Sequence, residues 1–373
     1  MKAWPLLGLV LIQSLLLAAH WFLFHTWIAF WSAPGAATVL AVRAVVLVLA
    51  FSFVFASLLS FRFSNPLVDF FYRCAAIWLG FLNYLFFAAC LSWLVWYAVV
   101  ALQLGFNPAV VRPFIFVALS AAGVLAGVFG VINRRWIRVR EVTVALAGLP
   151  ESWRGRRAVL MSDLHLGNIN RVAFSRRIVE MTARLKPDIV FIPGDLYDGG
   201  EANLDALVEP FSKLNAPLGI YFSSGNHEEF GGVEEKLGAI SRAGIEILHN
   251  RKVTVDGLHI AGVPYGDSTS PIRLRATLER LALTPGEASI LLNHMPSRLP
   301  IVERAGISLQ LSGHTHGGQL FPFTWFTRRA FGRFTYGLQS FGSLQVYTSY
   351  GAGTWGPPMR LGTHSEIVLL QFE

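Results

Sequence analysis

Histidine, aspartate and asparagine residues gather in five short blocks of the sequence, and each block follows a run of apolar residues. The blocks are Asp163-Leu164-His165, Gly194-Asp195, Gly225-Asn226-His227-Glu228, Asn293-His294 and Gly313-His314-Thr315-His316. Carboxylate and amide oxygens together with imidazole nitrogens form a mixed ligand set that suits manganese, iron, zinc or similar divalent ions. Cysteine chemistry is not expected, because both cysteines lie in one apolar segment of the first half of the chain. The blocks therefore predict a metal centre.

The blocks offer more ligands than a single ion needs. In two-metal sites the ions lie ~3.5–4 Å apart and hold both the attacking and the leaving oxygen of an in-line displacement. One aspartate would then have to bridge the two ions. Gly194, Gly225 and Gly313 each stand within a block, where the backbone must turn sharply or approach another segment closely. We expect a tight site with two metals.

The apolar runs before the blocks are predicted to be buried strands, because they alternate with amphipathic segments as in an α/β fold. The runs cover residues 158–161, 189–192, 219–222, 290–292 and 309–311, and the amphipathic segments lie near 172–186, 202–214, 233–243 and 272–283. Ligands of open α/β sheets bind outside the carboxyl ends of the strands. All five blocks are therefore expected at one sheet edge.

The first 133 residues have a different composition and carry few charged side chains, namely Lys2, Arg43, Arg62, Asp69, Arg73 and Arg112. A transmembrane helix needs about 20 predominantly apolar residues. Four stretches qualify, at about 5–31, 36–60, 75–102 and 113–132. We therefore expect a transmembrane domain over 1–133, a basic linker with a first strand over 134–154, and a globular domain over 155–373.

The distribution of basic residues predicts the orientation of the chain. Four crossings place the N-terminus, the loop around 61–74 and everything after residue 133 on one side of the membrane. That side holds Lys2, Arg62, Arg73, Arg134, Arg135, Arg138 and Arg140, whereas Arg43 and Arg112 lie toward the other. The positive-inside rule then predicts a cytoplasmic globular domain, with the bacterial inner membrane as the expected location. An uncleaved first helix is favoured over a signal peptide, because its apolar run continues to Trp31.

Taken together, the five blocks resemble the complete signature of the calcineurin-like metallophosphoesterases, in family order and over roughly residues 155–373. The stretches 313–319 and 353–360 further resemble a membrane-anchored bacterial branch of that superfamily. The resemblance implies an α/β sandwich with two β-sheets flanked by helices, here preceded by the four-helix transmembrane region. It also implies two divalent metal ions.

The resemblance assigns a role to each residue of the blocks. It implies that the first metal is held by Asp163, His165 and His316, the second by Asn226, His294 and His314, and both by Asp195. A water shared by the two cations would be the nucleophile, since bound cations lower its pKa toward neutral. His227 is expected to contact the phosphoryl group and protonate the leaving oxygen. Asp198 and Glu228 are expected to brace the site without binding metal.

The segment from Phe321 to Phe341 follows the last block and combines many aromatic residues with Arg328, Arg329 and Arg333, without any acidic residue. Such a mixture suits a membrane interface or an amphiphilic substrate. A segment packed on its own domain with solvated arginines is an equally good interpretation.

These observations predict a membrane-anchored dinuclear-metal hydrolase that cleaves a phosphoester or pyrophosphate bond by metal-activated hydroxide. Anchoring favours a membrane lipid or a lipid-linked nucleotide as the substrate. The alternatives are a phosphodiesterase for soluble substrates, with the helices only as a tether, and a non-catalytic metal-binding sensor. No specific nucleic acid is predicted as a partner, because the net charge of +8 is not concentrated in a long basic run.

Overall fold

The computed structural model describes residues 4–31, 34–63, 65–198, 203–283 and 286–373. Lys2, which contributes to the predicted charge asymmetry, lies outside the described residues. The chain divides into two compact units. The first comprises residues 1–132 with 356–359, and the second comprises residues 133–355 with 360–373.

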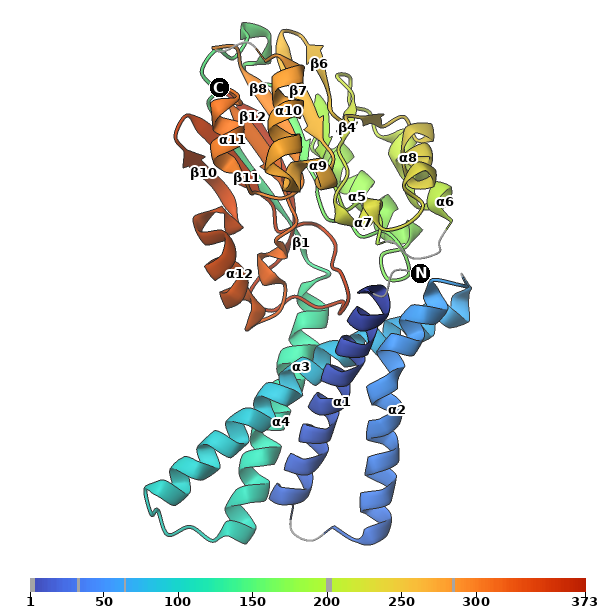
Figure 1. The fold of residues 1–373 in the computed structure, drawn as a ribbon, viewed down its shortest axis with the longest axis vertical. Helices are drawn as coiled ribbons and strands as arrows, with labels where there is room; N and C mark the ends of the chain where they lie inside the picture. Colours follow the sequence, from blue (N-terminus) through green and yellow to red (C-terminus); the bar gives the residue numbers. More distant parts are fainter. Residues whose placement is uncertain (1–3, 32–33, 64, 199–202, 284–285) are drawn as a thin grey trace. The chain divides into compact units, whose positions relative to one another are not determined.

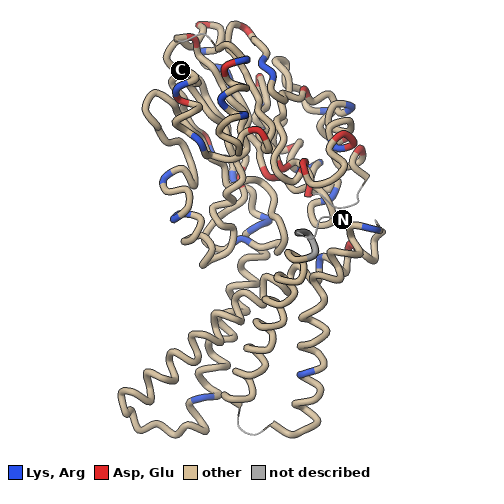
Figure 2. Tube along the Cα trace, viewed as in Figure 1, with Lys and Arg blue, Asp and Glu red and all other residues tan. Residues whose placement is uncertain are grey.

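The helices of the first unit are α1 (Trp4–Phe30), α2 (Ala36–Ser60), α3 (Pro66–Ala101) and α4 (Pro108–Asn133). All four are long and apolar enough to cross a membrane, which confirms the predicted number of apolar helices. Figure 2 shows that charged residues are sparse along them. A helix is the expected form for such segments, because its backbone groups bond within the segment and none is left unpaired in hydrocarbon.

The third and fourth helices begin earlier than predicted. The sequence placed their starts at residues 75 and 113, and the structure places them at Pro66 and Pro108. Asn65 and Pro66 form the start of the third helix. The side chain of Asn65 accepts hydrogen bonds from the backbone N–H groups of Leu67 and Val68 at 3.1 and 3.0 Å, and proline at the first helical position has no N–H to leave unpaired.

Polar side chains within this helical unit bond to neighbouring helices. Trp78 on α3 donates from Nε1 to Nε2 of His20 on α1 at 2.9 Å. Trp93 on α3 donates to the hydroxyl of Thr26 on α1, also at 2.9 Å. These two bonds fix α1 against α3, and they give the buried imidazole of His20 a structural partner.

The second unit contains two six-stranded sheets (Figure 1). The first sheet has, in spatial order, β1 (Ile137–Val144), β12 (Ser365–Phe372), β2 (Arg157–Leu160), β3 (Ile189–Ile192), β4 (Ile220–Phe222) and β5 (Glu246–Ile247). The second has β10 (Gly337–Phe341), β11 (Leu344–Thr348), β9 (Leu309–Ser312), β8 (Ser289–Asn293), β7 (Leu258–Val263) and β6 (Arg251–Val255).

The two sheets pack face to face, and helices cover their outer faces. Successive side chains of a strand point to opposite faces. In β3, Ile189 and Phe191 accordingly join the core between the sheets, whereas Val190 and Ile192 join the core under α5 (Val172–Arg184), α6 (Leu204–Val208) and α8 (Val233–Arg242). Helices α10 (Pro271–Leu281) and α11 (Leu299–Arg304) cover the second sheet. The predicted two-sheet α/β sandwich is confirmed.

The predicted position of the ligand blocks needs one correction. They were expected at the edge of one sheet, but β2, β3 and β4 belong to the first sheet and β8 and β9 to the second. The strands β2, β3 and β4 are mutually parallel, as are β8 and β9. Apolar runs that are buried on both faces do not reveal which sheet they join, so the sequence pattern alone could not separate the two sheets.

Shorter elements complete the second unit. The segment predicted as one helix over 202–214 is divided into α6 and the 3-10 helix η2 (Glu209–Lys213), which has Pro210 in its first turn; residue 202 lies outside the described residues. Other short helices are η1 (Glu151–Trp153), α7 (Asn226–Glu229), α9 (Tyr265–Thr269) and η3 (His316–Gly318). The aromatic segment folds as α12 (Phe323–Phe331), η4 (Gly332–Thr335) and β10.

Candidate metal centre

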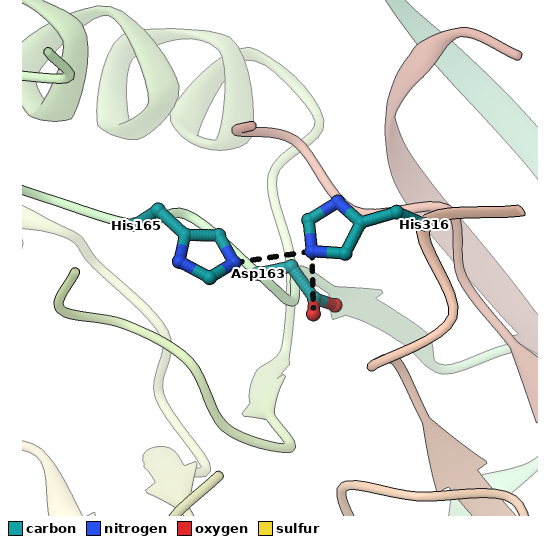
Figure 3. A group of neighbouring side chains, drawn as sticks. All are labelled: Asp163, His165 and His316. Carbon is teal, nitrogen blue, oxygen red and sulfur yellow. Dashed lines mark hydrogen bonds and ion pairs between the residues drawn. The ribbon is translucent and has the colours of Figure 1, made fainter. Parts of the chain in front are cut away.

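The first group of candidate ligands consists of Asp163, His165 and His316, and all three side chains are buried (Figure 3). Asp163 and His165 follow β2, whereas His316 opens η3 after β9. The Nε2 atoms of the two histidines lie 3.1 Å apart, and that of His316 lies 3.3 Å from Oδ1 of Asp163. Three potential donor atoms therefore converge on one point.

The second group consists of Asp195, His294 and His314, with Asn226 beside it. Nε2 of His294 lies 3.0 Å from Oδ2 of Asp195. Nδ1 of His314 lies 3.0 Å from Oδ1 of Asn226. The residues come from the ends of β3, β4, β8 and β9, which shows how the two sheets together build the site.

Asp195 connects the two groups. Its Oδ2 lies 3.8 Å from Nε2 of His165 in the first group as well as 3.0 Å from Nε2 of His294 in the second. A single carboxylate thus faces both clusters of donor atoms, as the bridging role requires. The structure brings together all seven residues that the sequence singled out as ligands.

The backbone at these positions is strained. Non-glycine residues rarely adopt positive φ, yet φ is positive at Asp163 (52°), His165 (48°), Asp195 (52°), His314 (68°) and His316 (47°). Each such residue costs of order 1–3 kcal/mol and persists only where the surroundings enforce it. Strain concentrated at the candidate ligands indicates that their side-chain positions are functional.

Two glycines allow the blocks to approach one another. A Cβ atom on Gly225 would collide with the carboxylate and backbone nitrogen of Asp195, and one on Gly313 would collide with the side chains of Asp163 and Ser162. Any larger residue at either position would push a candidate ligand away. The close approach that the sequence predicted for these glycines is present.

Glu228 connects the loop after β3 to the loop after β4 by hydrogen bonds. Its fully buried carboxylate accepts hydrogen bonds from the backbone N–H groups of Asp195 (2.9 Å), Tyr197 (2.9 Å) and Gly225 (2.8 Å). Burial and the neighbouring Asp195 carboxylate raise the pKa of Glu228 to about 6. Glu228 therefore holds two candidate ligand loops in register and is not itself among the converging donors.

His227 lies at the border of the cluster with its side chain 17% exposed. Its Nδ1 lies 3.1 Å from the carbonyl oxygen of Asp198. Because a carbonyl can only accept, Nδ1 carries the hydrogen and Nε2 remains for another partner. Burial and the nearby His165 lower the pKa of His227. Lys236 fixes the same turn by donating to the carbonyl oxygen of His227 at 2.9 Å.

Asp198 also supports the first group, since its Oδ1 lies 3.3 Å from Nδ1 of His165. The bracing role expected for Asp198 and Glu228 agrees with these contacts. Three further histidines of the second unit, at positions 249, 259 and 364, belong to none of the clusters of potential metal ligands found among the described residues.

Arg360 is a site residue that the sequence reasoning missed. It is fully buried, and its Nη2 contacts Nδ1 of His316 at 3.2 Å and donates to the carbonyl oxygens of Tyr350 (2.6 Å) and Gly353 (2.7 Å). Burial lowers its pKa to about 10, which leaves the guanidinium charged at neutral pH. Its place at the end of the 353–360 motif was the available signal.

The electrostatics of the cluster favour a cation. Burial alone would raise the pKa values of Asp163 and Asp195, but the surrounding imidazoles outweigh burial and hold both below their usual range. Burial lowers the pKa values of His314 and His316 to about 4. Two ionised carboxylates thus face two imidazoles that are neutral at pH 7. Both kinds of group have lone pairs that can bind a metal cation.

The tautomer of His294 fits a metal ligand. Its Nδ1 lies 2.8 Å from the carbonyl oxygen of Pro193 and must therefore donate. Its Nε2 is buried and lies 3.0 Å from Oδ2 of Asp195. Burial would lower its pKa, but Asp195 outweighs burial and raises it to about 9. A positive charge is therefore favoured between Nε2 and Asp195, and a divalent cation would satisfy both groups.

A two-sheet α/β sandwich with two joined aspartate and histidine groups at its strand ends defines the class of metal-dependent phosphoesterases. The family described as Calcineurin-like phosphoesterase matches residues 156–318. An uncharacterized metallophosphoesterase of Aquifex aeolicus is 33% identical over 258 residues, which cover 66% of this chain and 96% of the relative. The chain belongs to the calcineurin-like metallophosphoesterase family, as its motifs predicted.

Two further relatives are longer than their matched regions. A transmembrane protein with a metallophosphoesterase domain from Danio rerio is 36% identical over 67% of this chain and 60% of its own length. An uncharacterized metallophosphoesterase from Campylobacter jejuni is 32% identical over 64% of each chain. The match thus spans less than two thirds of these two relatives. The first of them is named as a transmembrane protein, in agreement with the four apolar helices of this chain.

Proposed function

We propose that this protein is a membrane-anchored hydrolase that binds two divalent metal ions and cleaves a phosphoester or pyrophosphate bond. The observation that carries the proposal is the pair of buried aspartate and histidine groups that Asp195 joins. Neither group would need so many converging donors for a structural role alone, and the strained backbone at the same residues supports a functional one.

The proposed ligands follow the two groups. Asp163, His165 and His316 hold one ion, Asn226, His294 and His314 hold the other, and Asp195 contacts both. Manganese, iron and zinc, or similar ions, match this combination of oxygen and nitrogen donors. The described residues around the donors supply the outer contacts that orient ligands, as Pro193 does for His294 and Asp198 does for His165.

The two cations would supply Lewis acidity and lower the pKa of water toward neutral. His227 is the proposed proton donor to the leaving oxygen. Asp198 orients it by accepting from Nδ1, which directs Nε2 away from the protein contact. The lowered pKa of His227 reduces the protonated fraction at neutral pH but makes that form a stronger acid. General acids of this kind contribute ~10²–10⁴-fold to rate.

Membrane anchoring favours a substrate in or near the bilayer, such as a phospholipid or a lipid-linked nucleotide. The arginines at positions 134, 135, 138 and 140 follow α4 directly and support a cytoplasmic site at the bacterial inner membrane. The alternative of a tethered phosphodiesterase for soluble substrates uses the same centre. A non-catalytic sensor is less favoured, because no ligand of the motif is missing.

A substrate panel on the detergent-solubilised, manganese-loaded protein tests this proposal. The panel contains an aryl phosphomonoester, an aryl phosphodiester, a nucleoside diphosphate ester and a phospholipid. We expect metal-dependent hydrolysis of at least one ester or anhydride, with loss of activity on chelation. A fully loaded protein that hydrolyses none of the four classes would contradict the proposal.

A further inference from the structure

The exposed side of α12 carries an unusual concentration of large apolar side chains. Phe321, Phe323, Trp325 and Phe326 are 57%, 48%, 61% and 56% exposed, and no residue of α12 is buried. Together with the exposed Arg328 and Arg329, these four residues are called the α12 surface. Aromatic side chains in such numbers are normally covered, and an uncovered group marks a site of interaction.

This surface is held firmly and borders the metal centre. The backbone of Phe321 donates to the carbonyl oxygen of Leu361 at 2.9 Å. A Cβ on Gly318, at the end of η3, would collide with the backbone of Phe323. At the other end of α12, the ring of Phe331 lies edge-on to that of His314, with 6.3 Å between centroids. The α12 surface therefore adjoins the turn that carries two candidate ligands.

The charge of the surface points to an anionic partner. Residues 321–341 contain no aspartate or glutamate, and Figure 2 shows blue but no red along α12. Within the described residues, no carboxylate lies within ion-pair distance of Arg328 or Arg329. Both positive charges are thus available to a partner.

The chain itself keeps a lipid surface nearby. The globular unit begins at β1, and only residues 134–136 separate β1 from α4. Three extended residues span about 10 Å, so the connection between the last apolar helix and the first strand is short. A bilayer that holds α4 is consequently present at a high effective concentration for the α12 surface.

We propose that the α12 surface docks on the anionic face of the bilayer and admits lipid-borne phosphoesters to the metal centre. Trp325 and Phe326 insert among the lipid head groups, while Arg328 and Arg329 bind lipid phosphates. Exposed aromatics beside basic residues are the composition of interfacial helices. The docking step is independent of catalysis, whereas the admission of substrate rests on the proposed hydrolase function.

The docking step is tested by measuring membrane depth in the full-length protein. A fluorophore is attached at Phe326→Cys in a background without the two native cysteines, and the protein is reconstituted into vesicles that contain spin-labelled lipid. The matched control is Ile272→Cys on α10, since Ile272 is 82% exposed on the same unit. We expect strong quenching at position 326 and little at position 272. Equal quenching at the two positions would overturn the proposal.

The role of charge has its own readout in the same experiment. Quenching at position 326 should be stronger in vesicles with phosphatidylglycerol than in vesicles of phosphatidylcholine alone. Arg328→Gln and Arg329→Gln together should remove this difference, since each arginine near an anionic surface changes binding by about fivefold. A difference that survives both substitutions would show that the arginines do not bind lipid.

The admission of substrate is tested with two aryl phosphodiesters that share the same scissile bond, one soluble and one carrying an acyl chain in the vesicle. The variant Trp325→Ser/Phe326→Ser should lower the ratio of acylated to soluble hydrolysis by roughly tenfold, and Ile272→Ser should leave that ratio unchanged. An unchanged ratio in the double variant would overturn this step. If the unaltered protein hydrolyses neither probe, the proposed function is contradicted. The docking step would still be decided by the depth-quenching experiment.

Discussion

At the scale of single residues, His227 and the seven proposed ligands have separable roles. The proposed ligands form two groups, and His227 forms a third group with His165 and Asp195 at their border, where its Nδ1 lies 3.1 Å from the carbonyl oxygen of Asp198. We propose that His227 donates a proton and that the other seven residues hold metal.

His227→Ala should therefore retain both metal ions but lose activity selectively. With a poor leaving group, turnover should fall by ~10²–10⁴-fold, because the leaving oxygen then depends on the general acid. With an activated aryl leaving group the loss should be much smaller. Steady-state rates on an alkyl and an aryl ester, each with measured metal content, provide the comparison. Equal losses on both esters would argue against proton donation.

Arg360 should act as a positioning residue through His316 and the loop of Tyr350 to Gly353. Its planar guanidinium bonds to several carbonyl oxygens at once, which the single ammonium of lysine cannot do. Arg360→Lys should raise the metal concentration for half occupancy by about tenfold, as is typical when an outer contact to a ligand is lost. Metal titration measures this half-occupancy concentration, and Arg333→Lys, at an exposed position, is the control. Unchanged metal affinity would limit Arg360 to a structural role.

The sequence identified the ligands but missed Arg360, and the reason is physical. Each ligand follows an apolar strand within a short motif, so its position is marked locally. Arg360 ends the 353–360 motif, but that motif does not reveal its partner, because His316 lies 44 residues away in the chain. Buried cations that bond to backbone carbonyls leave no periodic pattern in a sequence.

At the scale of elements, the site depends on how the ends of β3 and β4 are joined. Glu228 begins no strand and binds no metal in this proposal, yet its carboxylate satisfies three backbone N–H groups from two loops. Leaving a buried donor without a partner costs ~1–3 kcal/mol.

Glu228→Ala should consequently lower the free energy of unfolding by roughly 2–5 kcal/mol and reduce metal occupancy as well. Glu279→Ala, at an exposed position of α10, should change neither quantity. Thermal unfolding in detergent, with metal analysis of the folded fraction, measures both effects. A variant as stable as the unaltered protein would show that water can replace the carboxylate.

The strands that precede the ligand blocks could be predicted because they are short, apolar and followed by turns. Strands β10, β11 and β12 could not, since β11 and β12 pair with strands that are distant in the sequence and β10 joins the sheet through its hairpin partner β11. The helix α12 was equally hidden, because its side chains Phe323, Trp325 and Phe326 remain exposed and join no core. The start of α3 is marked in the sequence by Asn65 and Pro66, which have the residue types of a helix cap and a first helical position.

At the scale of the whole molecule, we propose that the four apolar helices hold the hydrolase unit on the cytoplasmic side of the membrane. A C-terminal fusion to green fluorescent protein should fluoresce, and the same fusion to periplasmic alkaline phosphatase should be inactive, since four crossings return the chain to the side of its N-terminus. Fusions after residue 105, between α3 and α4, should give the opposite pattern. An active alkaline phosphatase at the C-terminus would show that the globular unit lies on the opposite side of the membrane.

The central claim is that two metal ions, joined by Asp195, make this chain a phosphoesterase. The most direct test is a titration of the chelator-stripped protein with manganese, in which bound metal and hydrolysis of an aryl phosphodiester are measured together. We predict a plateau of about two ions per chain with activity rising mainly with the second ion, and loss of both the second ion and activity in Asp195→Asn. Full activity with a single ion, or two bound ions without hydrolysis, would contradict the account.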